Sequence, residues 1–160
     1  MRDGEVVAYV GLGSNLGDRA AHVARALEAL RATPGVEVGA VSPLLETEPV
    51  GGPPQGPYLN GAVELFVTLS ARELLARLLA IEAAAGRVRG LERNAPRCLD
   101  LDLLFYGDAR IDEPGLVVPH PRLHQRQFVL EPLCRIAPDF VHPVLRRSVA
   151  SLARDAAAGT

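Results

Sequence analysis

Two aspartates, Asp100 and Asp102, are the residues of this 160-residue chain best suited to carry chemistry. They alternate with Leu99, Leu101 and Leu103, which is the period of a β-strand, and residues two apart on a strand share a face about 7 Å apart. Two unpaired carboxylates at this distance repel each other, so a positive charge is expected beside them. Hard divalent cations prefer carboxylate oxygens, and phosphates often complete their coordination. We therefore predict that Asp100 and Asp102 hold Mg²⁺ at a phosphate site.

The segment just before these acids, residues 87–97, is rich in arginine and predicts a phosphate-binding lid. It contains four arginines and one acid, and the whole chain has no lysine. Guanidinium groups match phosphate oxygens bidentately, and loops that close over a substrate are mobile. The alternative is a solvated charged loop followed by a solvated edge strand. The apolar residues around the acids favour a strand inside the sheet, which strengthens the case for a metal site.

The expected elements alternate between strands and helices. They are strands at 5–12, 36–41 with a possible extension at 44–47, 58–69 and 98–106, and helices beginning near Asp18 and Ser70 and covering 122–136 and 148–158. Ser70 and Glu73 form a capping box, and Gly107-Asp108 predicts a hairpin from the last strand to residues 109–112. The order β-α-β-β-α-β is the ferredoxin-like split βαβ pattern. We predict one α+β domain, residues 1–160, with helices on one face of a mostly antiparallel sheet plus a C-terminal helical extension.

Composition places the chain among ordinary globular proteins. Hydrophobic residues make up 48%, charged residues 22%, and the net charge is −2, which gives no reason to expect nucleic-acid or membrane binding. No apolar run is long enough to span a bilayer and no signal peptide is evident, so we expect a cytoplasmic location. Cys98 and Cys134 lack metal-ligand spacing and are expected to pack as small apolar residues.

Three glycines near the N-terminus, Gly11, Gly13 and Gly17, lie where a strand should pass into a helix. Their spacing does not fit a dinucleotide-binding fingerprint, because position 16 is Leu. We interpret them as a tight turn into the helix.

Six collinear segments resemble the 6-hydroxymethyl-7,8-dihydropterin pyrophosphokinases of the folate pathway. They are Gly13-Ser14-Asn15-Leu16-Gly17, Glu46-Thr47-Glu48-Pro49-Val50-Gly51, Tyr58-Leu59-Asn60, Gly86-Arg87-Val88-Arg89, Pro96-Arg97 through Asp102, and Val118-Pro119-His120-Pro121. Together they extend over nearly the whole chain, and the set is far more specific than any one of its parts.

The resemblance implies an ATP-dependent pyrophosphokinase. Such an enzyme transfers the β,γ-diphosphate of ATP to the hydroxymethyl group of 6-hydroxymethyl-7,8-dihydropterin, giving AMP and the pterin diphosphate used in folate biosynthesis. It implies ATP as co-substrate, two Mg²⁺ ions at Asp100 and Asp102, no partner beyond the two substrates, and a monomer. The sequence leaves the proton acceptor open between a carboxylate and a hydroxyl made more acidic by metal.

The same resemblance assigns residues to three groups. Arg87 and Arg97 would be catalytic. The ATP-binding group would be Glu82, Arg87, Arg89, Arg97, Leu103, His120 and Arg126. The pterin-binding group would be Thr47, Glu48, Val50, Tyr58, Asn60 and Phe128. By the same resemblance, the loop Gly13-Ser14-Asn15 would border the pterin pocket in addition to forming the turn. Aromatic faces suit stacking on a flat ring, and an amide offers donors and an acceptor to its edge. Taken alone, each residue has an ordinary interpretation as core or solvated surface.

Two other classes of protein stay open at this point. One is a different metal enzyme with an Asp-x-Asp pair, such as a nucleotide-sugar transferase, although the large domain of such enzymes does not fit 160 residues. The other is a ferredoxin-like module that binds RNA or a regulatory ligand without catalysis. That class needs a basic sheet with exposed aromatic residues, and the sequence does not predict one.

Overall fold

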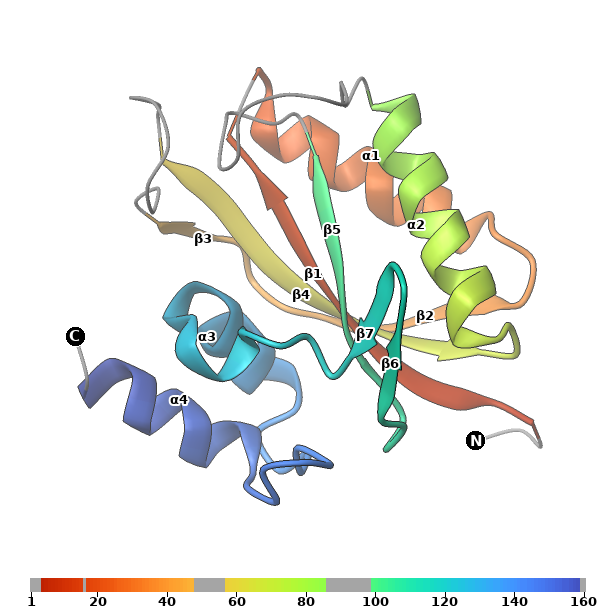
Figure 1. Ribbon diagram of the computed structural model, residues 1–160. Coiled ribbons are helices and arrows are strands. Elements are labelled where there is room, and N and C mark those ends of the chain that lie inside the picture. The colour runs from red at the N-terminus through yellow and green to blue at the C-terminus, as the bar shows by residue number, and fades with distance from the viewer. Residues whose placement is uncertain (1–3, 16, 48–56, 86–98, 159–160) are drawn as a thin grey trace.

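A five-stranded antiparallel sheet runs through the molecule, and helices pack against both of its faces (Figure 1). The computed structural model describes residues 4–15, 17–47, 57–85 and 99–158. The strands are β1 (Val6–Ser14), β2 (Val36–Val41), β3 (Leu45–Thr47), β4 (Tyr58–Val67) and β5 (Asp100–Tyr106). Their order is β2-β4-β1-β5, and β3 pairs with the beginning of β4.

One face of the sheet is covered by α1 (Arg19–Arg31) and α2 (Ala71–Ala84), as the sequence predicts. Asp18 caps α1 by accepting a hydrogen bond from the Ala21 amide at 3.1 Å. Ser70 and Glu73 form the expected capping box of α2. These caps satisfy amide groups that the first turn of a helix leaves unpaired, which explains why both helices begin where they do.

The core under α1 and α2 is built from apolar side chains of the sheet and of both helices. Alternate residues of β4 and β5 point into it, among them Leu65, Leu101 and Leu103, and they meet Leu74 and Leu78 of α2. All five side chains are buried. Burial of a leucine side chain contributes about 2 kcal/mol, so this face supplies much of the stability of the fold.

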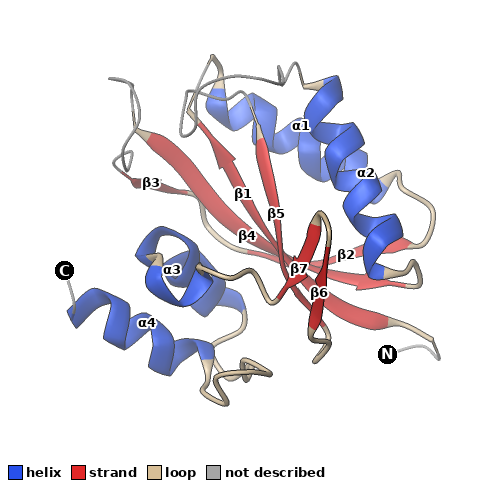
Figure 2. Ribbon diagram, viewed as in Figure 1, coloured by secondary structure: helices blue, strands red, loops and turns tan. Residues whose placement is uncertain are grey.

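The opposite face is covered by the C-terminal helices, which the sequence predicts only as an extension. A short 3₁₀ helix, η1 (Leu123–Gln125), leads into α3 (Gln127–Ile136), and α4 (Val149–Ala158) packs beside α3. Figure 2 shows this pair across the sheet from α1 and α2. Its core includes Phe105, Leu130 and Leu133. Helices therefore lie on both faces of the sheet.

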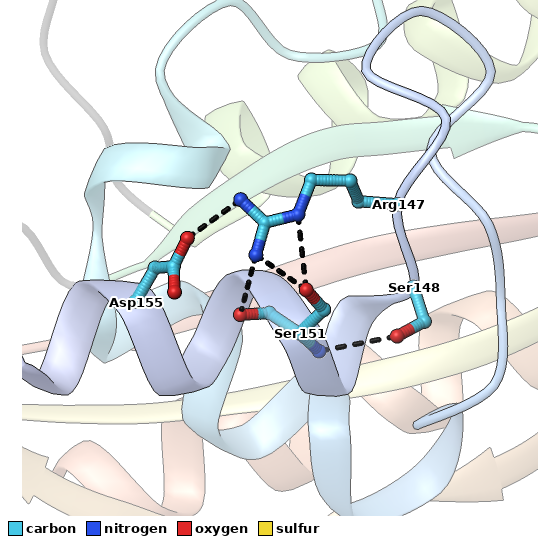
Figure 3. A network of polar contacts seen from close by, with 4 residues as sticks. All are labelled: Arg147, Ser148, Ser151 and Asp155. Carbon is cyan, nitrogen blue, oxygen red and sulfur yellow. Dashed lines mark hydrogen bonds and ion pairs between the residues drawn. The ribbon is translucent and has the colours of Figure 1, made fainter.

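The start of α4 is fixed by a polar network on its surface (Figure 3). The Ser148 hydroxyl accepts a hydrogen bond from the Ser151 amide at 3.1 Å, which caps the first turn. Arg147 lies along the helix, donating through Nε to the Ser151 hydroxyl at 2.9 Å and pairing with Asp155 at 2.6 Å. The hydrogen bond and charge of Arg147 lower the pKa of Asp155. Both partners are exposed, so the network orients the helix more than it stabilises the fold.

Two expectations about β5 are wrong. The expected hairpin from β5 to residues 109–112 does not form, because β6 (Ile111–Glu113) pairs with β7 (Leu116–Val118) in a separate two-stranded sheet. Nor does β5 lie inside the sheet: within the described residues it pairs with β1 alone and forms an edge. That edge is covered by α2 and by the segment after β7. Its apolar composition follows from this cover rather than from a central position.

Candidate functional site

The two acids stand at the beginning of β5, where three strand ends meet. Asp100 pairs with Gly13 of β1, and Asp102 pairs with Gly11. Both carboxylates are half-buried. Because Leu101 between them fills the core under α1 and α2, the acids project from the opposite face, on which α3 lies. The predicted side-by-side arrangement on one strand is confirmed.

The glycines beside the acids correct our interpretation of the N-terminal motif. Gly17 has a φ of +71°, as a tight turn requires, but Gly11 and Gly13 lie within β1. An ideal Cβ at Gly13 would stand 3.9 Å from the Asp100 Cβ, and one at Gly11 would stand 3.9 Å from the Asp102 Cβ. A side chain added at either glycine would therefore contact one of the two aspartates.

Three of the residues that the sequence assigns to the pterin lie together on the neighbouring strands. Asn60 and Tyr58 share a face of β4, and that face is also the face of Asp100, because the Gly13 position touches all three. Asn60 is 8% exposed and donates through Nδ2 to the Thr47 hydroxyl of β3. A buried amide tied in this way has a fixed orientation, which is what recognition of a ring edge requires.

Arg19 supports this region and was not predicted. It donates to the Pro57 carbonyl at 2.9 Å and pairs with Glu46 at 2.6 Å, so it ties α1 to β3 and to the entrance of β4. A cation at the first residue of a helix opposes the helix dipole. That unfavourable placement is the signal in the sequence that could have identified Arg19 as a residue with a tertiary role.

His120 comes close to the acids from the segment after β7. Its amide donates to the Leu104 carbonyl of β5 at 3.0 Å, and its Nδ1 accepts a hydrogen bond from the Arg122 amide at 3.3 Å. Burial lowers the pKa of His120, the nearby Arg126 charge lowers it further, and Asp100 opposes the change. The neutral ring is therefore favoured at neutral pH, and with Nδ1 as acceptor its proton sits on Nε2.

Arg126 and Phe128 are in contact where α3 begins. The Arg126 guanidinium carbon lies 5.6 Å from the centroid of the Phe128 ring, a cation–π arrangement. The residue assigned to ATP and the residue assigned to the pterin thus support each other. Arg126 also acts electrostatically on His120, so the start of α3 lies on the His120 side of the site.

Glu82 has a structural partner that the sequence did not predict. It is 2% exposed, and its Oε2 accepts a hydrogen bond from the Leu101 amide at 2.7 Å. It is therefore not a solvated residue at the end of α2. It holds the outer edge of β5 directly between the two acids, so it positions them whatever else it contacts.

The remaining assigned residues divide into two groups. Leu103 is 5% exposed and its side chain lies in the core under α1 and α2, so a contact with ATP would have to use its main chain. The others lie outside the described residues: they are Glu48, Val50, Arg87, Arg89 and Arg97.

The donor set fits a hard divalent cation that also binds substrate. Two carboxylates share a face, and the residues of β1 that pair with them are glycines. In the described part of the chain, no group of three or more His, Cys, Asp or Glu side chains comes together. Mg²⁺ is commonly held by one or two carboxylates and completes its coordination with water and phosphate oxygens. Two half-buried aspartates suit that behaviour better than that of a structural metal.

Comparison with known families gives a match over most of the chain. The family model described as 7,8-dihydro-6-hydroxymethylpterin-pyrophosphokinase matches residues 9–138. A protein of Synechocystis sp. is 46% identical over 145 residues, covering 91% of this chain and 73% of the relative. A protein of Methylorubrum extorquens is 48% identical over 134 residues, covering 84% of each. Both are named 2-amino-4-hydroxy-6-hydroxymethyldihydropteridine pyrophosphokinase.

The fold is also similar to that of solved structures. The wild-type HPPK-DHPS protein of Plasmodium falciparum, crystallised with pterin and p-hydroxybenzoate, superposes with a TM-score of 0.73 at 15% identity. The superposition covers 94% of this chain and 43% of that one, so this chain spans less than half of the larger protein. At this identity the likeness concerns the fold. Within the described residues, no helix has the length and apolarity needed to cross a bilayer.

Proposed function

The chain belongs to the 7,8-dihydro-6-hydroxymethylpterin-pyrophosphokinase family, and from this premise we propose how its own residues carry out the reaction. It is an ATP-dependent diphosphotransferase that moves diphosphate from ATP to the hydroxymethyl group of 6-hydroxymethyl-7,8-dihydropterin in folate biosynthesis. The family match decides among the three classes that the sequence left open. The proposal concerns the residues, the cation and the state of the protein.

The acids are the centre of the proposed mechanism. Asp100 and Asp102 hold Mg²⁺, two ions by resemblance to the family, on the face of the sheet that also carries Asn60. Mg²⁺ held by these carboxylates would supply positive charge to orient and polarise the triphosphate. The single observation that supports this assignment best is that Asp100, Asn60 and Tyr58 all approach the bare α-carbon of Gly13. One small area thus joins the groups suited to phosphate and the groups suited to the pterin.

The ring is held on the β4 side of this area. Tyr58 and Phe128 stack on the two faces of the pterin, while Asn60 and the segment of Thr47, Glu48 and Val50 meet its edge. Fixing a nucleophilic hydroxyl near the β-phosphorus converts a bimolecular encounter into an oriented one, which is the main contribution available to a protein in phosphoryl transfer.

The phosphates are held on the β5 side. Neutral His120 presents Nε2–H as a hydrogen-bond donor, and Arg126 supplies a guanidinium steadied by the Phe128 ring. Arg87, Arg89 and Arg97 close over the triphosphate from the segment before β5, with Arg87 and Arg97 stabilising charge as it develops. Leu103 contacts ATP through its main chain. Glu82 keeps β5 in place beneath the site and lies at its nucleotide side.

The proposal extends to the state of the protein. We expect a single pyrophosphokinase domain over residues 1–160, acting as a monomer in the cytoplasm without nucleic acid or membrane. The finer fold class is ferredoxin-like: α1 and α2 each connect two strands that are separated by one other strand in the order β2-β4-β1-β5. Size-exclusion chromatography and cell fractionation test the monomer and the location.

Product analysis tests the function directly. The protein is incubated with ATP, Mg²⁺ and 6-hydroxymethyl-7,8-dihydropterin, and nucleotides are separated by chromatography while ³¹P NMR follows the phosphates. AMP and a pterin diphosphate ester should appear in equal amounts. Formation of ADP, or no consumption of ATP that depends on the pterin, would show that the proposed reaction is wrong.

A further inference from the structure

Arg19 has no part in the assignments above, and it stands where a cation does not favour a helix. It is the first residue of α1, next to amide groups whose partial positive charge repels it. An arginine at this position weakens the helix slightly. Any benefit of Arg19 to the protein therefore comes from its contacts outside α1.

The guanidinium group of Arg19 bridges two strands through two different nitrogens. Its Nη1 donates to the Pro57 carbonyl at 2.9 Å, and its Nη2 pairs with the Glu46 carboxylate at 2.6 Å. Pro57 directly precedes β4, and Glu46 is the middle residue of β3. The planar fork of a guanidinium group holds two acceptors in a fixed geometry, whereas the ammonium group of a lysine is a single point charge. Arg19 therefore fixes the position of β3 relative to the start of β4.

Glu46 lies on the opposite face of β3 from the candidate site. Its neighbour Thr47 accepts the hydrogen bond from Asn60, on the face of the sheet that carries Asp100. Adjacent residues of a strand point to opposite faces, so Glu46 points to the face that α1 and α2 cover. Arg19 thus holds β3 from one face, while Thr47 holds the Asn60 amide on the other.

β3 depends on such an external contact because it is short. It has three residues, and in the described part of the chain it pairs with β4 alone. A segment held by so few main-chain hydrogen bonds opens readily. Its last pair joins Thr47 to Tyr58, the residue that follows the Pro57 carbonyl bound by Arg19. The two contacts of Arg19 therefore keep this end of β3 in register with β4.

We propose that Arg19 is a positioning residue for the pterin, which fixes β3 so that Thr47 keeps the Asn60 amide in one orientation. This inference rests on the proposed function, in which Asn60 meets the edge of the ring. An amide turned by half a rotation exchanges its donor and its acceptor, so its orientation decides which ring edge it binds. The side chain of Glu46 is 60% exposed, and an ion pair of this kind contributes little to stability. The effect of Arg19 should therefore appear in pterin affinity rather than in folding.

Arg19→Met and Arg31→Met form a matched pair for steady-state kinetics, because Arg31 at the other end of α1 pairs with Glu28 of the same helix at 2.9 Å. Arg19→Met should raise the KM for the pterin about tenfold, the scale of one lost hydrogen bond. Its KM for ATP, kcat and melting temperature should stay near the wild-type values, and Arg19→Lys should recover part of the loss. Arg31→Met should behave like the wild type. A wild-type pterin KM in Arg19→Met, or an equal rise for both substrates, would overturn the proposal.

A second measurement does not depend on turnover. In ¹⁵N-labelled protein without substrates, the side-chain amide protons of Asn60 should exchange faster with water in Arg19→Met than in the wild type or in Arg31→Met. Calorimetry should show the same loss of affinity for 6-hydroxymethylpterin in Arg19→Met alone. Unchanged Asn60 signals in Arg19→Met would overturn the inference. If the wild type forms no AMP but both of these effects appear, the proposed function fails while this inference stands.

Discussion

The two faces of β5 have different roles in this protein. Toward α1 and α2, β5 presents Leu101 and Leu103, both buried in an apolar core. Toward α3 it presents Asp100 and Asp102, which are half-buried and pair with two glycines of β1. Since side chains alternate along a strand, the stabilising face fixes the spacing and direction of the reactive face. The leucines and the hydrogen bond from the Leu101 amide to Glu82 thus position the acids from the opposite face of the strand.

Substitutions on the two faces of β5 should have the largest effects, on turnover for one face and on stability for the other. Asp100→Asn or Asp102→Asn should lower turnover by roughly 10³-fold or more, because the neutral amide binds Mg²⁺ poorly, while the melting temperature stays near the wild-type value. Leu103→Ala should instead lower the free energy of unfolding by about 2–5 kcal/mol. AMP formation and urea denaturation measure the two quantities. Near-normal turnover in both aspartate variants would remove their proposed metal role.

The next prediction concerns the arginines of the proposed lid, residues 87–97. Arg97→Ala should slow the chemical step by roughly 10²- to 10³-fold, the scale for loss of one preorganised charge-stabilising donor. Pterin affinity should change much less, because the proposed partner is phosphate. Arg93→Ala, with no assigned contact, is the matched control and should be milder. Single-turnover rates measure both, and equal rates in all three proteins would leave this segment as ordinary charged surface.

Glu82 joins the two faces, and its variants sharpen the comparison. Glu82→Ala leaves the buried Leu101 amide without its acceptor and should cost about 1–3 kcal/mol of stability. Glu82→Gln keeps an oxygen at that position and should cost less. Turnover should fall in Glu82→Ala beyond what the loss of folded protein explains, since the edge between the acids is released. Chemical denaturation with parallel kinetics checks this. Equal stability of the two variants would contradict the structural role of this hydrogen bond.

Substitution of the two aromatic residues, Tyr58 and Phe128, should have smaller effects, and these should differ in which ligand is bound less tightly. Tyr58→Ala should weaken pterin binding by about 1 kcal/mol beyond lost burial and leave ATP binding unchanged. Phe128→Ala should weaken pterin binding more than ATP binding, but ATP binding should also weaken, because the ring beneath the Arg126 guanidinium is lost. Calorimetry with each ligand separately distinguishes the two. Equal loss of both ligands in Tyr58→Ala would indicate a folding defect.

The smallest effect concerns pH. The folded-state pKa of His120 is lowered from 6.5 by burial and by Arg126, so the folded protein takes up this proton less readily than the unfolded chain. Stability is therefore unaffected by His120 above its unfolded pKa and falls as the pH drops below about 6.5. His120→Asn should flatten that part of the dependence of melting temperature on pH. Asp100→Asn should lower the His120 pKa further, and NMR titration of the imidazole protons measures it. An unchanged titration would mean that the two groups do not interact.

Local patterns predicted most of the elements and the position of the acids. The capping box at Ser70 and the alternation of Leu101 and Asp102 depend on a few adjacent residues, and the structure confirms both. The pairing of β6 with β7, the edge position of β5 and the covered second face depend on contacts between distant segments, which no local pattern contains. The roles assigned to individual site residues came from the resemblance to a family, and these stay predictions.

Contacts between distant segments also limited what the sequence could predict about the candidate site. Gly13 was interpreted as part of a turn, since a glycine run between strand and helix looks the same in the sequence whether its residues bend the chain or continue the strand. Only the register with Asn60 and Asp100 distinguishes the two. The contact of Glu82 with Leu101 was likewise hidden, because 19 residues separate the partners. Arg19 differs from Glu82 and Gly13, because its positive charge at the first residue of a helix opposes the helix dipole and can be recognised in the sequence.

Binding of Mn²⁺ in place of Mg²⁺ tests most directly whether the polar face of β5 is the metal and phosphate site. Electron paramagnetic resonance counts the Mn²⁺ ions bound per chain in the presence of α,β-methylene ATP and 6-hydroxymethylpterin. We expect two ions in the wild type, loss of tight binding in Asp100→Asn and Asp102→Asn, and full binding in a destabilised but folded Leu103→Ala protein. Wild-type Mn²⁺ binding in both aspartate variants would contradict the account.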